Sequence, residues 1–293
     1  MIVDALDHLI LAVPDLSAAA PFERLGLTLT PPARHHARGT ENRAFFLKSG
    51  DGDAYIELLS AHDRAEAAES PDGPELLAKL DAGGGLVRLM LRSSNLEAAK
   101  ARLSEEGIQA IRSSVDREDG TPICEVLRVL SPTAAGCPFA LIAYPETPEE
   151  RLARHRANGL LDHAFPVRRI DHVAVLVEDV DSATTFWTDV LGVPLVGEIV
   201  SSGATIRQLG AGDVTVELIG PTGPDSRFGG RPMGLISVAA FEVADLDQAV
   251  AEARSRGFTV PDPEVGVIPG TRRATISPSD MSGLAFQLIQ YTG

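Results

Sequence analysis

Hydrophobic and polar residues follow a pattern that recurs along the chain. The segment beginning at Leu6, LDHLILAVPDLSAAAPFERLGLTL, opens with an apolar run typical of a strand and continues with helical spacing to a glycine. The segment beginning at Ile170, IDHVAVLVEDVDSATTFWTDVLGVPL, has the same order. The glycines, Gly26 and Gly192, suit the left-handed position that closes a helix. Because an apolar run follows each glycine, both segments predict a strand, a helix and a second strand.

Two weaker copies of this pattern begin at Gly85 (GLVRLMLRSSNLEAAKARLSEEGIQAI) and Gly234 (GLISVAAFEVADLDQAVAEARSRGFTV). Both end in similar apolar strands, CPFALIAY and LAFQLIQY. Each copy predicts one strand, a helix and three more strands. The four βαβββ units lie near residues 5–61, 84–145, 168–221 and 233–292. We therefore expect an α+β fold in which successive units pair into two tandem modules with curled mixed sheets.

The domain boundary is predicted where the chain becomes polar and is flanked by prolines. This stretch contains TPEERLARHR, which is typical of a short capped helix. We expect an N-terminal module at residues 1–145, a linker helix within 146–168 and a C-terminal module at 169–293. The segment HDRAEAAESPDGPELLAKLDAGGG is interpreted as a connection between the first two units.

Composition narrows the possible partners. The net charge of −15, from 41 acidic and 26 basic residues, disfavours binding to nucleic acid or to anionic membranes. The two cysteines, Cys124 and Cys137, form no CxxC motif and are interpreted as reduced, buried thiols. The opening MIVDALDHLILAV has no basic region before its apolar residues, so it does not resemble a signal peptide. These features predict a cytoplasmic protein; the sequence leaves monomer and homodimer open.

The repeated motifs resemble those of the vicinal oxygen chelate superfamily, which contains glyoxalases, bleomycin-resistance proteins and extradiol dioxygenases. The resemblance rests on the openings LDHLIL and IDHVAV, on the later strands AYIELLS and VTVELIG, and on the strand–DL–helix order. The N-terminal half, with RHHARGTEN before NRAFFL, resembles the glyoxalase-like branch, and the C-terminal half resembles epimerases and glyoxalases. This resemblance implies a cleft in each module that holds a small molecule, and in some members a divalent metal ion.

The resemblance also implies four ligand positions per module, on the first and last strands of each unit. In the N-terminal module these positions hold His8, Glu57, Arg88 and Ala140. In the C-terminal module they hold His172, Glu217, Val238 and Gln287. If the first unit faced the third instead, the two histidines and two glutamates would form one joint set.

Neither module keeps a complete metal site. Arg88 cannot donate a lone pair, and we expect it to pair with Glu57 inside the N-terminal cleft. The C-terminal cleft keeps His172, Glu217 and Gln287, three donors that suit one divalent ion such as zinc. Two histidines and one carboxylate, as ring-cleaving dioxygenases require, are not present at these positions.

Other polar residues are candidate ligand contacts. The loop RHHARGTENR offers polar side chains for a carboxylate or carbonyl of the ligand, or is only a solvated turn. These side chains are His35, His36, Thr40, Asn42 and Arg43, of which His36 and Asn42 are the selected ligand contacts. In the C-terminal half Arg207 is a candidate for an anion, as are Arg272 and Arg273. Trp187 lies in an amphipathic run and is predicted to be a core residue.

Two functions remain open at this point. The first is an isomerase or lyase that acts on a small oxygenated molecule, with Glu57 or Glu217 as the base and a metal ion or Arg88 holding an enolate oxygen. The second is a metal-free protein that sequesters a drug or metabolite without catalysis. A purely structural role would predict clefts filled by side chains.

Overall fold

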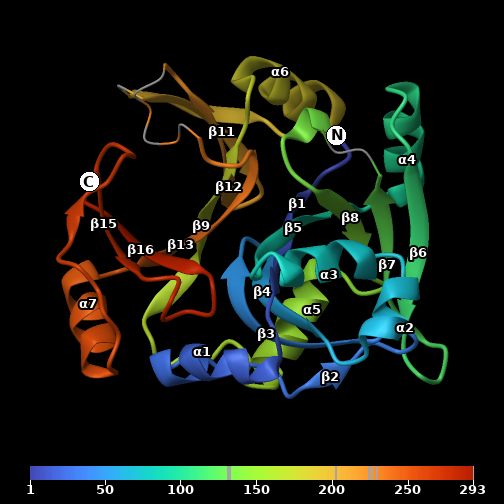
Figure 1. The fold of residues 1–293 in the computed structure, drawn as a ribbon, viewed down its shortest axis with the longest axis horizontal. Coiled ribbons are helices and arrows are strands. Elements are labelled where there is room, and N and C mark those ends of the chain that lie inside the picture. The colour runs from blue at the N-terminus through green and yellow to red at the C-terminus, as the bar shows by residue number, and fades with distance from the viewer. Residues whose placement is uncertain (131–132, 202, 224–225, 227, 229, 293) are drawn as a thin grey trace.

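The computed structural model describes residues 1–130, 133–201, 203–223, 226, 228 and 230–292, and two sheets of eight strands dominate it. Figure 1 shows the first sheet, with the strands of the N-terminal half, on the right and the second sheet on the left. The expected α+β fold with two tandem, curled mixed sheets is therefore confirmed.

The first sheet has the strand order β2-β3-β4-β1-β5-β8-β7-β6. Strands β1 and β5 lie antiparallel at its centre and join the first two units, while β1 and β4 are parallel. The bounds of its strands are β1 Ala5–Ala12, β2 Ala33–Arg34, β3 Thr40–Ser49, β4 Gly52–Ala61, β5 Gly85–Arg92, β6 Ala110–Asp116, β7 Pro122–Val129 and β8 Phe139–Ala143.

The second sheet repeats this arrangement as β10-β11-β12-β9-β13-β16-β15-β14. Its strands are β9 Val167–Leu176, β10 Leu195–Ser201, β11 Ala204–Ala211, β12 Val214–Pro221, β13 Gly234–Val243, β14 Glu264–Val265, β15 Thr271–Ile276 and β16 Ala285–Tyr291. Units pair in sequence order in both sheets, so the alternative pairing of the first unit with the third is not the one adopted.

The helices lie between strands of each unit and at the connections. They are η1 Leu16–Ala19, α1 Ala20–Leu25, α2 Arg64–Glu69, α3 Gly73–Asp81, α4 Leu96–Glu105, η2 Thr133–Ala135, α5 Pro148–Ala157, α6 Val180–Thr185, the π-helical turn η3 Phe186–Val190 and α7 Leu246–Ser255. Within the described residues, no helix has the length and apolar character needed to span a membrane.

One local expectation differs from the structure, and one connection contains two helices. The run Leu27–Thr30 does not form a strand, because its leucines enter the core and Pro31 and Pro32 lack the N–H that a ladder needs. The connection after β4, interpreted from the sequence only as a segment that joins the first two units, forms α2 and α3. Asp63 caps α2 through the backbone N–H groups of Ala65 and Glu66, and a proline lies in the first turn of α3.

A single hydrophobic core contains residues of both sheets. The rings of Phe45 in β3 and Phe241 in β13 lie 6.1 Å apart, and Phe139 of β8 lies 6.5 Å from Trp187 in η3. Trp187 is fully buried, which confirms its predicted place in the core, and its indole N–H donates to the carbonyl of Ala135 at 3.0 Å. The domain boundaries at residues 145 and 168 stay a prediction.

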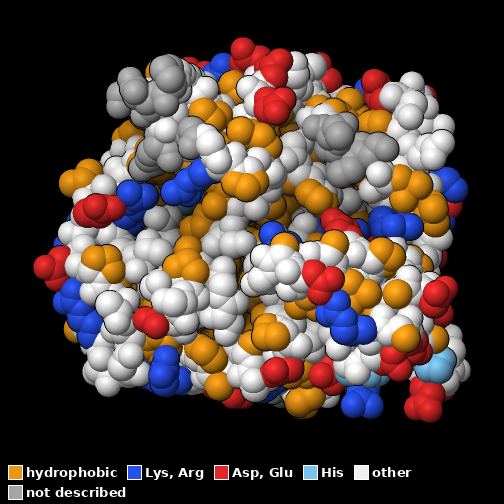
Figure 2. Space-filling view, viewed as in Figure 1, with side chains coloured by type: hydrophobic (Ala, Val, Ile, Leu, Met, Phe, Trp, Pro, Cys, Tyr) orange, Lys and Arg blue, Asp and Glu red, His pale blue; other side chains and the backbone are white. Residues whose placement is uncertain are grey.

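Charged side chains cover the outside. Figure 2 shows acidic and basic side chains interspersed with apolar ones over one face of the molecule.

Candidate functional site

Each sheet has a cleft on one face. The N-terminal cleft has a volume of about 270 Å³ and the C-terminal cleft about 470 Å³. His8, Glu57, Arg88 and Asn42 line the first, and His172, Glu217, Val238 and Gln287 line the second. Ala140 is fully buried beside Met90 under the first cleft and offers no donor atom. The sequence therefore brings the expected side chains together, while their binding roles stay predictions.

A β-bulge places an aspartate beside each cleft histidine. The pairing of β1 with β5 shifts between Leu6 and His8, and the pairing of β9 with β13 shifts at the equivalent point. As a result His8 faces the cleft while Asp7 accepts a hydrogen bond from its Nδ1 at 2.7 Å. Asp171 and His172 repeat this contact at 2.7 Å. Because a carboxylate only accepts, each Nδ1 carries the proton and each Nε2 points toward the cleft.

Each histidine faces a glutamate across a short gap. His8 Nε2 lies 3.7 Å from Glu57 Oε2, and His172 Nε2 lies 4.0 Å from Glu217 Oε2. These separations are too long for a direct hydrogen bond. The other carboxylate oxygen accepts a side-chain amide in both modules, from Asn42 to Glu57 and from Gln208 to Glu217. The second carboxylate oxygen and the imidazole Nε2 of each module thus face the same space.

The arginine of the N-terminal cleft has different partners from those expected. Arg88 is buried on the cleft wall, but its Nη1 donates to Asp72 at 2.6 Å and its Nη2 to Glu75. The predicted pair with Glu57 is therefore wrong. Glu57 instead contacts His8, His35 and Asn42. The reason is that α3, read from the sequence as part of a connection, carries two carboxylates over the cleft.

The histidine loop contributes His35 to the cleft instead of His36, which was the histidine selected from the sequence. His35 lines the N-terminal cleft, whereas His36 is exposed and does not line it. His35 Nδ1 bonds to the hydroxyl of Thr40 at 2.8 Å, and Asn42 donates to its Nε2 at 3.2 Å. Burial lowers the pKa of His35, although the charge of Glu57 opposes this. The adjacent His-His pair gave no signal to distinguish the two.

The three candidate arginines of the C-terminal half differ in whether they line the cleft. Arg207 does not line the cleft and pairs with Asp181 and Glu198. Arg272 also lies outside it, paired with Asp247 at 2.8 Å, while Arg273 lines the cleft wall.

Charge and burial together determine the pKa of His172 in the C-terminal cleft. Burial lowers the pKa of His172, but its bond to Asp171 and the charge of Glu217 outweigh burial and raise that pKa above the usual value near 6.5. Gln287 raises that pKa further. His172 therefore binds a proton more readily than an ordinary histidine.

The two clefts differ in their fit to a divalent metal ion. Among the described residues, no three His, Cys, Asp or Glu side chains are grouped closely enough to hold one. In the N-terminal cleft the Arg88 position holds a cation that would repel a metal. In the C-terminal cleft the oxygen of Gln287 adds a third donor to His172 and Glu217, so the donor set there fits one divalent ion.

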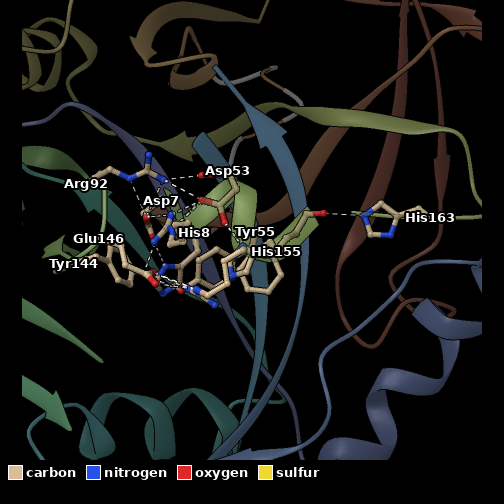
Figure 3. A network of polar contacts seen from close by, with 12 residues as sticks. Asp7, His8, Asp53, Tyr55, Arg92, Tyr144, Glu146, His155 and His163 are labelled. Carbon is tan, nitrogen blue, oxygen red and sulfur yellow. Dashed lines mark hydrogen bonds and ion pairs between the residues drawn. The ribbon is translucent and has the colours of Figure 1, made fainter. Parts of the chain in front are cut away.

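A buried ionic cluster lies behind His8, and its members were not selected from the sequence (Figure 3). Helix α5 provides Arg151 and His155, both almost completely buried, which contact Asp7 and Asp53. Burial opposes the ionisation of Asp7, but Arg151 and the bond from His8 hold the pKa of its carboxyl far below the usual range. The segment TPEERLARHR, which contains Arg151 and His155, predicts a polar helix, but this pattern is equally typical of a solvated linker.

Comparison with known proteins agrees with this architecture. Residues 6–169 match the family model described as glyoxalase-like domain, and residues 169–288 match the glyoxalase/bleomycin resistance protein/dioxygenase superfamily. A mitochondrial methylmalonyl-CoA epimerase of Bos taurus is 27% identical over 176 residues, which cover 57% of this chain and 99% of that protein. The Mus musculus enzyme of the same name is 28% identical over 130 residues, covering 42% of this chain and 72% of that protein.

Two solved structures share the fold across nearly the whole chain. A hypothetical protein from Staphylococcus aureus has a TM-score of 0.65 at 15% identity, covering 97% of this chain and 98% of that one. A mutant 4-hydroxymandelate synthase from Streptomyces coelicolor has a TM-score of 0.65 at 17% identity, covering 100% and 94%. At these identities the likeness concerns the fold alone.

Proposed function

Because the chain belongs to the glyoxalase-like domain family of the vicinal oxygen chelate superfamily, we propose that it binds a small oxygenated organic molecule and acts on it as an isomerase or lyase. The observation that carries this proposal is the gap between imidazole and carboxylate at the C-terminal cleft. A substrate on the cleft side of the pair can place a carbonyl oxygen at His172 Nε2 and the carbon next to that carbonyl group at Glu217 Oε2, because Nδ1 and Oε1 are already bonded.

The proposed chemistry is a proton transfer at a carbon next to a carbonyl group. Glu217 takes the proton from carbon through Oε2, and the electron pair moves onto the carbonyl oxygen as an enolate. The protonated imidazole of His172, favoured by its raised pKa, donates a hydrogen bond to that oxygen. Delivery of a proton to the opposite face of that carbon, or to the neighbouring carbon, completes an isomerisation, and expulsion of a leaving group completes a lyase reaction.

His172, Glu217 and Gln287 would hold a divalent ion if one is bound. The ion would then polarise the substrate oxygen as a Lewis acid, in place of the N–H of His172. Arg88 is not proposed to hold an enolate, because its guanidinium already bonds to Asp72 and Glu75.

Two relatives guide the choice of substrate. Both are named methylmalonyl-CoA epimerase, which favours isomerase over lyase for this chain and makes methylmalonyl-CoA the first compound to test. The N-terminal cleft supports the second candidate, sequestration of a ligand without catalysis, because Arg88 and Ala140 replace two of its four ligand positions.

The experiment is deuterium exchange in D2O, read by mass spectrometry, with methylmalonyl-CoA and a panel of small 2-oxo and 2-hydroxy acids. We expect the wild type to incorporate deuterium at the carbon next to the carbonyl and Glu217→Gln to lose about 10²- to 10⁴-fold in rate. Arg207→Ala is the matched control, since Arg207 lies outside the cleft. Elemental analysis of the same samples determines their metal content.

The outcomes separate the two candidates. A compound that raises the melting temperature without exchanging its proton supports sequestration. Exchange that survives unchanged in Glu217→Gln would falsify the proposed chemistry, and exchange lost in Glu57→Gln instead would point to the N-terminal cleft.

A further inference from the structure

We propose that Arg151, on helix α5, is a positioning residue that holds the imidazole of His8 in the one orientation in which its Nε2 faces Glu57. This proposal rests on the function proposed above, because that function is what gives His8 a role. Its test measures the imidazole of His8 directly and requires no enzymatic activity.

The guanidinium of Arg151 bridges two buried carboxylates. Its Nε donates to Asp53 Oδ1 at 2.8 Å, and its Nη2 donates to Asp7 Oδ2 at 2.7 Å. The guanidinium also lies 4.0 Å from the ring centre of Tyr144. Only 2% of Arg151 is exposed, and both aspartates are fully buried. An ion pair at this depth depends strongly on both partners, because an unpaired charge there is costly.

Every side of the Asp7 carboxylate is occupied. Oδ1 accepts from His8 Nδ1 at 2.7 Å and from the hydroxyl of Tyr144 at 2.9 Å. Oδ2 accepts from Arg151 and, at 3.1 Å, from Arg92. A carboxylate held by four donors cannot rotate, so the Nδ1 proton of His8 has a fixed partner. The ring of Tyr55, stacked 4.2 Å from the imidazole, limits its remaining rotation.

Helix α5 is in turn fastened by Asp53. The second oxygen of that carboxylate accepts from His155 Nδ1 at 2.8 Å, so two residues one helical turn apart bond to one aspartate. The ring of His155 also lies 4.0 Å from that of Phe46 in β3. The helix between the two halves of the sequence therefore forms the back of the N-terminal site.

The C-terminal module has no such reinforcement within the described residues. Asp171 keeps the bonds to His172 and to the hydroxyl of Tyr291, but its arginine, Arg169, comes from the same strand and is partly exposed. Asp213, four residues before Glu217 as Asp53 is before Glu57, is exposed and accepts from the backbone of Gly50. His8 and His172 therefore both donate to the preceding aspartate. Of these two aspartates, Asp7 is the one held by a buried arginine from another element.

The test is nitrogen NMR of protein labelled with ¹⁵N-histidine, at one pH, on wild type and on the Arg151→Met, Arg151→Lys and His155→Gln variants. We expect the wild type to show His8 as a single tautomer with a slowly exchanging Nδ1 proton. In Arg151→Met that proton should be lost to fast exchange and the tautomers should mix, while the signals of His172 stay in place. Arg151→Lys, which keeps the charge, should restore the signal in part.

Arg154→Met is the matched control, because Arg154 lies on the same helix but pairs with the exposed Glu146. If circular dichroism shows that Arg151→Met does not fold, the His8 signals of Arg151→Lys and His155→Gln are compared with those of the wild type instead. Unchanged His8 signals in the folded Arg151 variants would overturn the proposal. Equal changes at His8 and His172 would also overturn it, because they would indicate a general loss of structure.

Discussion

Arg88 donates to Asp72 at 2.6 Å and thereby ties the wall of the N-terminal cleft to the start of helix α3. Leu76 of the same helix packs with Leu59 and Val87 of the sheet, so apolar contact and charge pairing hold α3 over one end of the cleft. Arg38 also pairs with Asp72, at 3.4 Å, from the loop before β3. This aspartate therefore connects three segments around the cleft.

We predict that Arg88→Ala lowers the free energy of unfolding by about 1–3 kcal/mol. A fully buried pair would cost about 3–5 kcal/mol when broken, but Asp72 and Glu75 are each about one-third exposed, so water compensates part of the loss. Chemical denaturation measures the effect. A double-mutant cycle should find coupling between Arg88 and Asp72 and nearly none between Arg88 and Glu57; the reverse order would restore the pair expected from the sequence.

The amides that bond to the cleft glutamates provide a matched pair of variants. Asn42→Leu and Gln208→Leu each leave one oxygen of a buried carboxylate without its donor. We expect each variant to lose about 1–3 kcal/mol of stability. Chemical denaturation measures the loss. A loss below about 0.5 kcal/mol in both variants would mean that these amides do not stabilise the carboxylates.

The histidines should titrate in a defined order. His172 has a raised pKa, so its stabilising contribution is complete below about pH 6.5 and is lost as the pH rises through the folded-state value. His35 has a lowered pKa, so its contribution is present above about pH 6.5 and is lost as the pH falls. NMR titration should place His172 above 6.5 and His35 below it. A midpoint for His35 above that of His172 would contradict the assigned environments.

Trp187, the single tryptophan of the chain, reports on the contact between the two halves. Its indole donates to Ala135 of the second unit from within the third unit. We expect Trp187→Phe to cost about 1–3 kcal/mol, because it removes volume from the core and leaves a buried carbonyl unpaired. Fluorescence and circular dichroism of the wild type should follow one unfolding transition. Two separate transitions would show that the shared core does not couple the modules.

The repeats were sufficient to predict both sheets, because a period of two along each strand also determines which residues share a face. The resemblance to the vicinal oxygen chelate superfamily placed Glu57 and Glu217 at ligand positions with the cleft histidines, and both glutamates line the clefts. Alternation in ATIRQLG separates Arg207 from Gln208, so the position of Arg207 outside the cleft follows from the strand alone.

Other features of the sites required tertiary structure. The bulges at Asp7 and Asp171 break the alternation on which the strand argument depends, so the bonds from these aspartates to the histidines had no sequence signal. From the sequence, Arg151 is expected on the surface of a polar helix, because its partner Asp7 lies 144 positions away in the chain. The partner of Arg88 was missed for the same reason: Asp72 lies in a segment whose fold over the cleft no local pattern indicates.

The most direct test of the account is a crystal structure of the wild type with a compound that exchanges its proton. We propose that the substrate lies on the cleft side of His172 and Glu217 and contacts both. We expect a ligand oxygen at about 2.6–3.2 Å from His172 Nε2, with the exchanging carbon facing Glu217 Oε2. A ligand bound anywhere else, including the N-terminal cleft, or one in the C-terminal cleft that contacts neither side chain, would contradict this proposal.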